Sequence, residues 1–242
     1  MTNVAHSRWL YPTHGEEVAP LPPGVITARG GVAVPRRGRS GRPAERERAK
    51  SRPRLGGPEE YKRSTRSPPP RRGRAQSLSR ATTDDLDAVC AIVARAIGAL
   101  EAEGIYQWDE HYPSREVLGE DIDARHMHVI RVGGEVVGFV TIDDDEPVEY
   151  RSLSWRYPAP ALVVHRLTID PPYQRSGLAR RLMEFTESEA SARGYRSIRL
   201  ESFVANRRAC SLYERSGYRK VGVIEFRKGP FCCYELGVES RP

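Results

Sequence analysis

The most constraining feature of the sequence is a β-branched segment that runs into a glycine-containing loop and then into an amphipathic helix. A predicted strand over 161–169 is closed by Asp170-Pro171-Pro172, and Gly177 precedes a predicted helix over 178–193. The first amides of such a helix have no intrahelical acceptor and lie at the positive end of the helix dipole. A glycine there lets an anion approach the backbone closely, so this arrangement favours a phosphate or pyrophosphate.

The loop differs from the common nucleotide-binding fingerprints. Residues 174–179 are too few for a Walker loop and lack its Lys-Ser/Thr pair, and they hold one glycine where a dinucleotide fingerprint has three. Arg175, Arg180 and Arg181 are cationic side chains suited to phosphate groups. By itself, a single glycine before a helix is also compatible with ordinary packing, and this alternative stays open at this point.

The remaining pattern mixes helices, strands and hairpins. Apolar residues at helical spacing predict a helix with Thr83 as its N-cap and a stop at Gly104, and Ser114 is expected to cap a short second helix. Two β-branched runs, 126–132 and 135–142, flank a Gly-Gly turn and predict a hairpin. Further predicted elements are a strand over 197–203, a helix over 207–215 and strands near 218–224 and 231–238. This order predicts an α/β (α+β) domain with a mixed sheet.

The N-terminal third has a different composition. Residues 1–77 carry 17 Lys and Arg against 6 Asp and Glu, a net charge of +11, whereas residues 78–242 carry 22 against 26, a net charge of −4. The first segment also holds 11 of the 19 prolines and 9 of the 21 glycines, and it has too few apolar residues to offset its ordering entropy. We therefore expect residues 1–76 to be a disordered basic extension. Three interpretations stay open: a gene start placed too far upstream, an inert tail, and a polycationic arm for RNA or an acidic surface.

Composition also excludes some classes of protein. The chain has no run of about 18 apolar residues, which excludes a membrane-spanning helix, and its first 20 residues lack the apolar core of a secretory signal. The four cysteines, Cys90, Cys210, Cys232 and Cys233, show neither CxxC nor metal-ligand spacing. We expect free thiols in a reducing cytoplasm and no metal site.

Two motifs together resemble the GNAT superfamily of acyl-CoA-dependent N-acyltransferases. The family's pyrophosphate loop, Gln/Arg-x-x-Gly-x-Gly/Ala, is similar to Gln174-Arg175-Ser176-Gly177-Leu178-Ala179. The family's segment Asn-x-x-Ala-x-x-Leu-Tyr-x-x-x-Gly-Phe/Tyr is similar to residues 206–218, which begin with Asn206 and include Tyr213. The resemblance covers roughly residues 77–238, and the basic extension matches no family known to us.

The resemblance implies a central twisted mixed sheet, flanked by helices, whose fourth strand over 161–169 splays away from the fifth over 197–203. Acetyl-CoA, as the co-substrate, would lie in that wedge, and its pantetheine would pair with backbone left unpaired by the splay. The residues that the resemblance places at acetyl-CoA are Leu167, Thr168, Ile169, Gln174, Arg175, Ser176, Gly177, Leu178, Ala179, Arg180 and Asn206.

The resemblance also implies direct attack by an amine, which requires a deprotonated nucleophile, donors to the oxyanion and an acid for the leaving thiolate. Tyr213 matches the family's thiolate-protonating tyrosine, and an aromatic residue that only packs in the core is the alternative. Asn206 is expected to contact the cofactor, to cap the helix that follows, or to do both.

The general base is less defined. The acidic base that some family members carry on the fourth strand would fall near Val163, so that carboxylate is absent. His165 lies on the same strand face and titrates near neutrality, which makes it a candidate, although a structural histidine is the alternative. Glu201 on the neighbouring strand is a comparable candidate, and a water relay without a dedicated base also stays open.

The segment between the first two helices is the candidate acceptor pocket, because family members commonly use this region. Gln107, Trp108 and Tyr112 are expected to contact a small amine, and Asp109 or Glu110 to attract its charge. A connecting loop anchored by Trp108 is the alternative. The acidic run 143–146 is expected to be a solvated hairpin end, with attraction of a cationic acceptor as the second interpretation.

The sequence therefore predicts an N-acetyltransferase domain over residues 77–238 that acts on a small primary amine. A non-catalytic acyl-CoA sensor and an RNA-associated module that uses the basic extension are the alternatives. The sequence leaves open whether the chain acts alone or as a homodimer.

Overall fold

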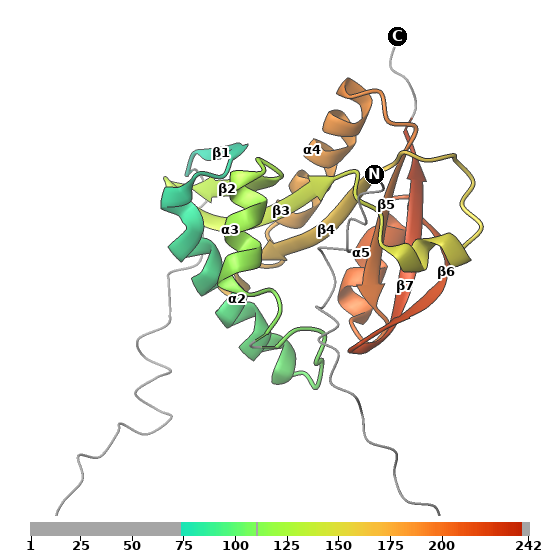
Figure 1. The fold of residues 1–242 in the computed structure, drawn as a ribbon. Coiled ribbons are helices and arrows are strands. Elements are labelled where there is room, and N and C mark those ends of the chain that lie inside the picture. Colours follow the sequence, from blue (N-terminus) through green and yellow to red (C-terminus); the bar gives the residue numbers. More distant parts are fainter. Residues whose placement is uncertain (1–73, 110, 239–242) are drawn as a thin grey trace, which may run out of the picture. The chain divides into compact units, whose positions relative to one another are not determined.

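The computed structural model describes residues 74–109 and 111–238 (Figure 1). The prediction of a disordered extension over 1–76 therefore lies outside the described residues, apart from 74–76. No helix in the described part of the chain is long and apolar enough to cross a membrane.

The described elements alternate between strands and helices. In chain order they are β1 (Gln76–Arg80), α2 (Leu86–Glu101), α3 (Arg115–Asp123), β2 (Met127–Val132), β3 (Glu135–Asp143), β4 (Leu162–Ile169), α4 (Leu178–Ala192), β5 (Ser197–Phe203), α5 (Arg207–Arg215), β6 (Arg219–Phe226) and β7 (Gly229–Gly237). Short 3₁₀ turns lie at Thr83–Asp85, Val148–Ser152 and Pro171–Tyr173.

The strands form a mixed seven-stranded sheet in the order β1-β2-β3-β4-β5-β7-β6. All neighbouring strands are antiparallel except β4 and β5, which run parallel. The β4–β5 pairing stops at Val164 and Leu200, although β4 continues to Ile169 and β5 to Phe203. The predicted splay between the fourth and fifth strands is confirmed, and no described strand pairs with the last five residues of β4 on this side.

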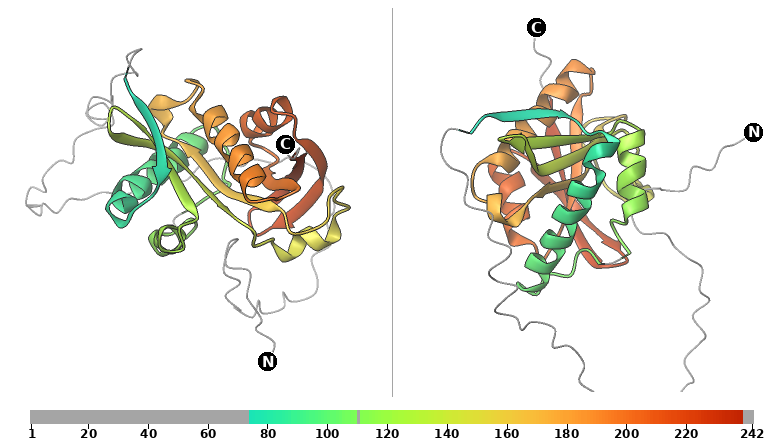
Figure 2. Two further views of the ribbon diagram at one scale, coloured as in Figure 1. Left: turned by 90° about the horizontal axis from the view of Figure 1, so that it is seen from above. Right: turned by 90° about the vertical axis from the view of Figure 1, so that its left-hand side faces the viewer.

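Helices cover both faces of the sheet (Figure 2). Side chains alternate along a strand, so neighbours such as Phe139 and Val140 of β3 enter different cores. Phe139 packs with residues of α2 and α3, including Ile92 and Leu118. Val140 packs on the opposite face with residues of α4, including Leu182. A third, aromatic-rich cluster lies beyond the splay and includes Tyr112, Tyr150, Val163, Phe226 and Phe231.

A β-bulge in β4 lies where the two strands separate. Thr141 pairs with Arg166 and Ile142 pairs with Val164, so His165 is the extra residue on β4. A bulge bends its strand and turns the extra side chain to a new direction. The splay and the changed direction of His165 therefore begin at the same point of the sheet.

Most sequence-predicted elements are present, with two differences at the N-terminal end. Thr83 does not cap the helix, because a 3₁₀ turn precedes α2. Thr82 is the N-cap of that turn, its amide donates to Asp85 Oδ2 at 2.9 Å, and Asp85 is the N-cap of α2. The short strand β1 was not predicted. Its side chains are mostly exposed, so it lacks the apolar alternation that marks a half-buried strand, and only its pairing with β2 defines it.

Candidate active site

The loop before α4 is held in place by its own side chains. Gly177 is the N-cap of α4 with φ of +86°, a left-handed conformation that glycine adopts without steric cost. Gln174 Nε2 donates to the Ile169 carbonyl at 3.2 Å, and the Ser176 hydroxyl donates to the Tyr173 carbonyl. These bonds hold the loop in one conformation. The amides of the first turn of α4, which have no intrahelical acceptors, therefore lie at a defined position.

The end of β4 is fixed from two sides. Asp170 is buried and accepts hydrogen bonds from Arg95 of α2, at 2.8 Å from Nε and 2.9 Å from Nη2. On β3, a Cβ at Gly138 would lie only 2.7 Å from the Thr168 carbonyl oxygen, so the two strands approach closely because this residue is glycine. The end of β4, which leads into the loop, is therefore held in place by both neighbours.

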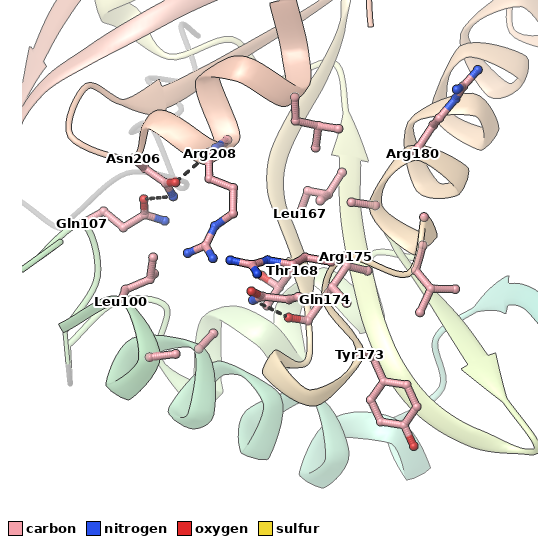
Figure 3. A pocket seen from close by; sticks show the side chains of 18 of the residues that line it. Leu100, Gln107, Leu167, Thr168, Tyr173, Gln174, Arg175, Arg180, Asn206 and Arg208 are labelled. Carbon is pink, nitrogen blue, oxygen red and sulfur yellow. Dashed lines mark hydrogen bonds between the residues drawn. The ribbon is translucent and has the colours of Figure 1, made fainter. Parts of the chain in front are cut away.

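A cavity of about 310 Å³ lies between α2, the end of β4, the loop and α5 (Figure 3). The predicted acetyl-CoA residues gather here: every one of them except Ser176 lines the cavity. Further lining residues that the sequence did not single out are Ala96, Ala99, Leu100, Tyr173, Arg208, Ala209, Leu212 and Arg215. The cavity thus joins apolar walls to a helix N-terminus and several cations.

The side chains of the arginines near the cavity have different partners. Arg175 and Arg208 both line the cavity (Figure 3). Arg208 also forms an ion pair with Glu103 at 2.8 Å. Arg180 turns outward to Glu184, at 2.9 Å. Arg181, which we expected at the phosphates, instead donates to Gln76 of β1 at 2.6 Å and is not among the residues that line the cavity.

A second, smaller cavity of about 70 Å³ adjoins the first. The two cavities share lining residues from the segment between α2 and α3, which we call the acceptor segment, and from β4 and α5. These shared residues are Gln107, Trp108, Leu167, Asn206 and Ala209. The other residues that line the small cavity are Tyr112, His165, Glu201, Ser202, Phe203, Tyr213 and Phe231. The predicted catalytic and acceptor residues are therefore brought together at the point where β4 and β5 separate.

Tyr213 belongs to both the core and the small cavity. Its ring packs at 6.0 Å from that of Tyr218 and 5.8 Å from that of Tyr234, between centroids. Burial raises the pKa of the Tyr213 hydroxyl well above its usual value, and the negative charge of Glu201 raises it further. The phenol therefore keeps its proton at neutral pH and is available as a hydrogen-bond donor to a departing thiolate.

Glu201 is a half-buried carboxylate at the wall of the same cavity. The hydroxyl of Tyr150, from the 3₁₀ turn Val148–Ser152, donates to Glu201 Oε2. Burial raises the pKa of Glu201, and the positive charge of His165 and the hydrogen bond from Tyr150 oppose this shift without cancelling it. No sequence signal pointed to Tyr150, because its contact with Glu201 spans 51 residues.

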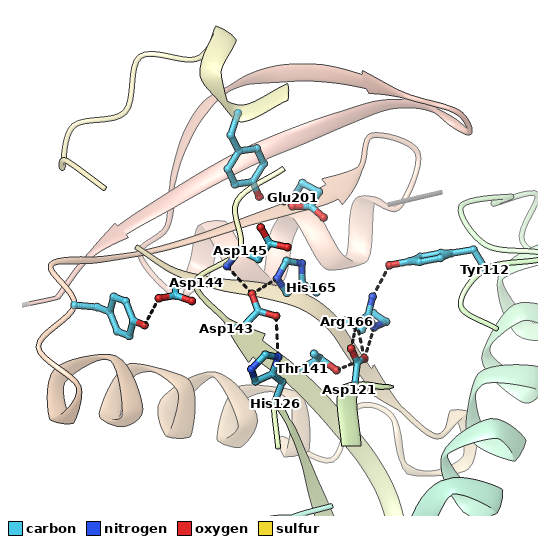
Figure 4. Close-up of polar contacts among 12 residues, drawn as sticks. Tyr112, Asp121, His126, Thr141, Asp143, Asp144, Asp145, His165, Arg166 and Glu201 are labelled. Carbon is cyan, nitrogen blue, oxygen red and sulfur yellow. Dashed lines mark hydrogen bonds and ion pairs between the residues drawn. The ribbon is translucent and has the colours of Figure 1, made fainter. Parts of the chain in front are cut away.

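His165 is held by a carboxylate that we expected in solvent. Its side chain is 1% exposed, and Nε2 lies 2.7 Å from Asp143 Oδ1 (Figure 4). Asp143 is the last residue of β3 and is itself buried, so the interpretation of 143–146 as a solvated hairpin end is wrong at this residue. Burial raises the pKa of Asp143, but the hydrogen bond and charge of His165 outweigh it and lower the pKa.

The acceptor segment is tied to the C-terminal half of the domain. Gln107 Oε1 accepts from Asn206 Nδ2 at 2.9 Å. Asp109 forms ion pairs with Arg227 at 2.6 Å and with Lys228 at 2.8 Å, both in the turn between β6 and β7. The carboxylate that we expected to attract an amine is therefore engaged with two cations, and Asp109 does not line the small cavity.

Tyr112, at the other end of this segment, is fixed by a buried ion pair. Its hydroxyl lies 2.6 Å from Arg166 Nη1, and Arg166 Nε lies 2.9 Å from Asp121 Oδ2. Thr141 donates to the same Asp121 oxygen at 3.0 Å. Tyr112 is thus oriented by Arg166 and presents its ring, rather than a mobile hydroxyl, to the small cavity.

The cysteines and the potential metal ligands form no cluster of their own in the described part of the chain. All four cysteines are free thiols. In the described ranges, no group of three or more His, Cys, Asp or Glu side chains is arranged to hold a metal ion.

A mixed sheet that opens between two parallel strands, with a helix N-terminus at the opening, defines the class of fold and site found in acyl-CoA-dependent acyltransferases. The model of the acetyltransferase (GNAT) family matches residues 94–218, which are 125 of the 242 residues. The chain belongs to the GNAT acetyltransferase family.

Solved structures share the fold. A protein from Staphylococcus aureus MU50, provisionally classed as an acetyltransferase, is 25% identical, with a TM-score of 0.55 over 67% of this chain and 99% of its own. A GNAT-family acetyltransferase from Streptococcus agalactiae is 17% identical, with a TM-score of 0.61 over 69% and 96%. The ribosomal-protein-S18-alanine N-acetyltransferase of Escherichia coli is 19% identical, with a TM-score of 0.51 over 69% and 97%. No curated protein matches the chain.

Proposed function

We propose that this chain transfers an acetyl group from acetyl-CoA to a small primary amine by direct attack. The observation that carries the proposal is the junction of two cavities where β4 and β5 separate. The larger cavity contains the phosphate-binding features, and the smaller one is lined by His165, Glu201 and Tyr213. A donor and an acceptor held in these two spaces would meet at the shared wall formed by Leu167, Asn206 and Ala209.

The larger cavity fits acetyl-CoA in charge and polarity. The amides of Gly177 and the residues after it, with Arg175 and Arg208, suit a pyrophosphate. Leu100, Leu167 and Leu212 of the lining suit an uncharged pantetheine arm. The edge of β4 after Val164 offers backbone groups for pairing with that arm's amides. When bound, acetyl-CoA supplies the thioester whose acetyl group is transferred.

Three side chains of the small cavity are assigned separate roles. Glu201, a half-buried carboxylate, attracts the ammonium form of the amine. His165 takes a proton from the amine nitrogen, and Tyr213 gives its proton to the departing thiolate. Gln107, Trp108 and Tyr112 surround the acceptor with a polar amide and two aromatic faces.

The size of the acceptor space supports a small molecule over a protein N-terminus. The small cavity measures about 70 Å³, and the segment beside it is tied down at Gln107, Asp109 and Tyr112. A polypeptide would require an open channel to this point. The acetyltransferase domain is proposed to span residues 77–238, and a cytoplasmic location stays a prediction of the sequence.

The test is a screen for thiol release by the purified full chain with acetyl-CoA and a panel of primary amines. We expect turnover with at least one small amine, and calorimetry should detect binding of acetyl-CoA and of CoA. Failure to bind either ligand would refute the proposal.

Tyr213→Phe separates an enzyme from a non-catalytic acyl-CoA sensor. Loss of the acid should lower turnover at least tenfold, within the range of general acid catalysis, while CoA affinity stays nearly unchanged. Tyr106→Phe, at an exposed tyrosine, is the matched control and should keep full activity. Binding of acetyl-CoA without turnover of any amine would favour the sensor.

A further inference from the structure

His165 lies at an irregular position of β4, next to the small cavity. It is the extra residue of the β4 bulge, and it lines the small cavity together with Glu201 and Tyr213. Its side chain is almost fully buried, so its orientation is set by neighbours rather than by solvent. One of these neighbours is Asp143, whose Oδ1 lies 2.7 Å from His165 Nε2.

The contact with Asp143 selects one tautomer of the imidazole. Asp143 Oδ1 lies 2.7 Å from His165 Nε2, and the same oxygen accepts from the Asp145 amide at 2.8 Å. An ionised carboxylate only accepts hydrogen bonds, so the proton of neutral His165 resides on Nε2. The lone pair of the ring is then on Nδ1, and the carboxylate stabilises the imidazolium that forms when Nδ1 takes a proton.

A second histidine contacts the other oxygen of the same carboxylate. His126, immediately before β2, places Nδ1 at 3.2 Å from Asp143 Oδ2, within ion-pair distance. Its side chain is 34% exposed, whereas those of Asp143 and His165 are 3% and 1% exposed. Asp143 therefore lies between a histidine at the cavity and a histidine that solvent reaches (Figure 4).

We propose that Asp143 is the positioning residue that makes His165 the general base of the transfer, and that His126 tunes this pair from the solvent side. The inference rests on the proposed function and deepens it, since it names the residues that orient and tune the proposed proton acceptor.

Solvent and two side chains of the small cavity, His165 and Tyr213, account for every proton in the step. The amine loses its ammonium proton to solvent, the C–N bond forms with the thioester carbonyl carbon, and the C–S bond breaks. His165 takes the remaining proton that the amine nitrogen must lose, and the thiolate takes the Tyr213 proton. The imidazolium then returns a proton to the Tyr213 phenolate, because both side chains line the same cavity.

Charged groups from several elements surround His165. Asp143 on β3, Glu201 on β5 and Asp121 on α3 are negative and favour the imidazolium, whereas Arg166 beside it opposes it. Asp143→Asn should therefore disfavour the imidazolium, and removal of His126, which shares the Asp143 carboxylate, should favour it.

The experiment compares Asp143→Asn and His126→Gln with the wild-type chain, using both pH–rate profiles and histidine-selective NMR. For Asp143→Asn we expect kcat to fall about 100-fold, with the KM for acetyl-CoA unchanged and the acidic limb of kcat/KM moved about one pH unit lower. For His126→Gln the limb should move to higher pH. Shifts in opposite directions are not expected from a merely structural role.

Asp144→Asn is the matched control, because Asp144 is the adjacent carboxylate and is exposed. It should leave kcat and the pH profile unchanged. Thermal unfolding checks that Asp143→Asn is folded. If it is not, the test depends on His126→Gln, at a partly exposed position, and on the shift of the acidic limb of its kcat/KM profile. Unchanged profiles in both variants would overturn the proposal.

NMR keeps this inference distinct from the proposed function. The wild-type imidazole of His165 should show the Nε2–H tautomer, and its titration midpoint should fall in Asp143→Asn. If no amine is acetylated but the tautomer and midpoint are as expected, the proposed function fails while the Asp143–His165 coupling stands. If amines are acetylated and the midpoint does not move, the positioning role fails alone.

Discussion

One side chain, Asn206, joins the acceptor segment to helix α5. Its Oδ1 accepts from the Ala209 amide at 3.1 Å and caps the helix, and its Nδ2 donates to Gln107 Oε1 at 2.9 Å. Both Asn206 and Gln107 line both cavities. The helix that carries Tyr213 and the segment that carries Gln107 are therefore linked through a single amide group.

Substitutions at Asn206 should separate these two functions. Asn206→Ala removes the cap and should lower the free energy of unfolding by about 1 kcal/mol, measured in urea. Asn206→Asp keeps a capping oxygen but loses the donor to Gln107, so its stability should stay near that of the wild type while the KM for the amine rises. An equal loss of stability in both variants would contradict the cap assignment.

Gly177 should be sensitive because of its backbone conformation and its position. An added Cβ would meet nothing within 4 Å, so Gly177→Ala costs only the strain of φ at +86°, about 1 kcal/mol. The new methyl group would lie at the first amides of α4, and we expect acetyl-CoA affinity to fall about tenfold, or ~1.4 kcal/mol, by calorimetry.

Gly194 provides the matched control for that substitution. It has φ of +78° and equally open surroundings, but it follows the C-terminal end of α4. Gly194→Ala should lower stability by a similar amount and leave acetyl-CoA affinity unchanged. Equal losses of affinity in the two variants would show that the amides of the loop are not the binding site.

Asp109 should make stability depend on acidic pH. Burial raises its pKa, but hydrogen bonds from Lys228 and Arg227 outweigh burial and bring the pKa far below the usual 3.8. Because the folded-state pKa is the lower one, the stabilisation is present above about pH 3.8 and is lost as the pH falls below it. Asp109→Asn should therefore flatten the decline in unfolding free energy between about pH 4 and pH 2.

The control for Asp109 is Asp87, whose ion pair with Arg115 is exposed. Exposed pairs contribute little to stability, so Asp87→Asn should keep the wild-type decline. Urea unfolding at each pH provides the comparison. If the unfolding free energy of Asp109→Asn declines with falling pH as steeply as that of the wild type, the ion pairs with the β6–β7 turn do not anchor the acceptor segment.

Glu201 should act on binding of the amine more than on the chemical step. We expect Glu201→Gln to raise the KM for the amine at least tenfold with a smaller effect on kcat, because a half-buried carboxylate attracts the cationic form. Burial raises the pKa of Glu201, so the wild-type KM should rise as the pH falls and the carboxylate gains its proton. In Glu201→Gln this pH dependence should disappear.

Steady-state kinetics with the best amine of the screen tests the role of Glu201. Glu225→Gln, at an exposed glutamate of β6, is the control and should keep the wild-type KM. If Glu201→Gln instead lowers kcat with KM unchanged, Glu201 rather than His165 is the general base.

Local signals in the sequence predicted much of this fold. The helix over 207–215 and the strand over 197–203 have the predicted bounds, and Ser114 caps α3 by accepting from the Val117 amide at 3.4 Å. Caps, glycine turns and apolar periodicity act within a few residues, so each can be recognised in one segment at a time. The loop at Gly177 could be recognised for the same reason.

What the sequence by itself determined was the order of elements, the position of the loop at Gly177 and the family's two motifs. Only the tertiary structure decided that Asp143 is buried against His165, that Asp109 is engaged by the β6–β7 turn, and that Arg181 faces β1. Each of these contacts joins residues 22 or more positions apart, through strand pairing and a bulge that no local pattern encodes. Burial of a charge depends on what the rest of the chain places beside it, and that is a property of the folded molecule.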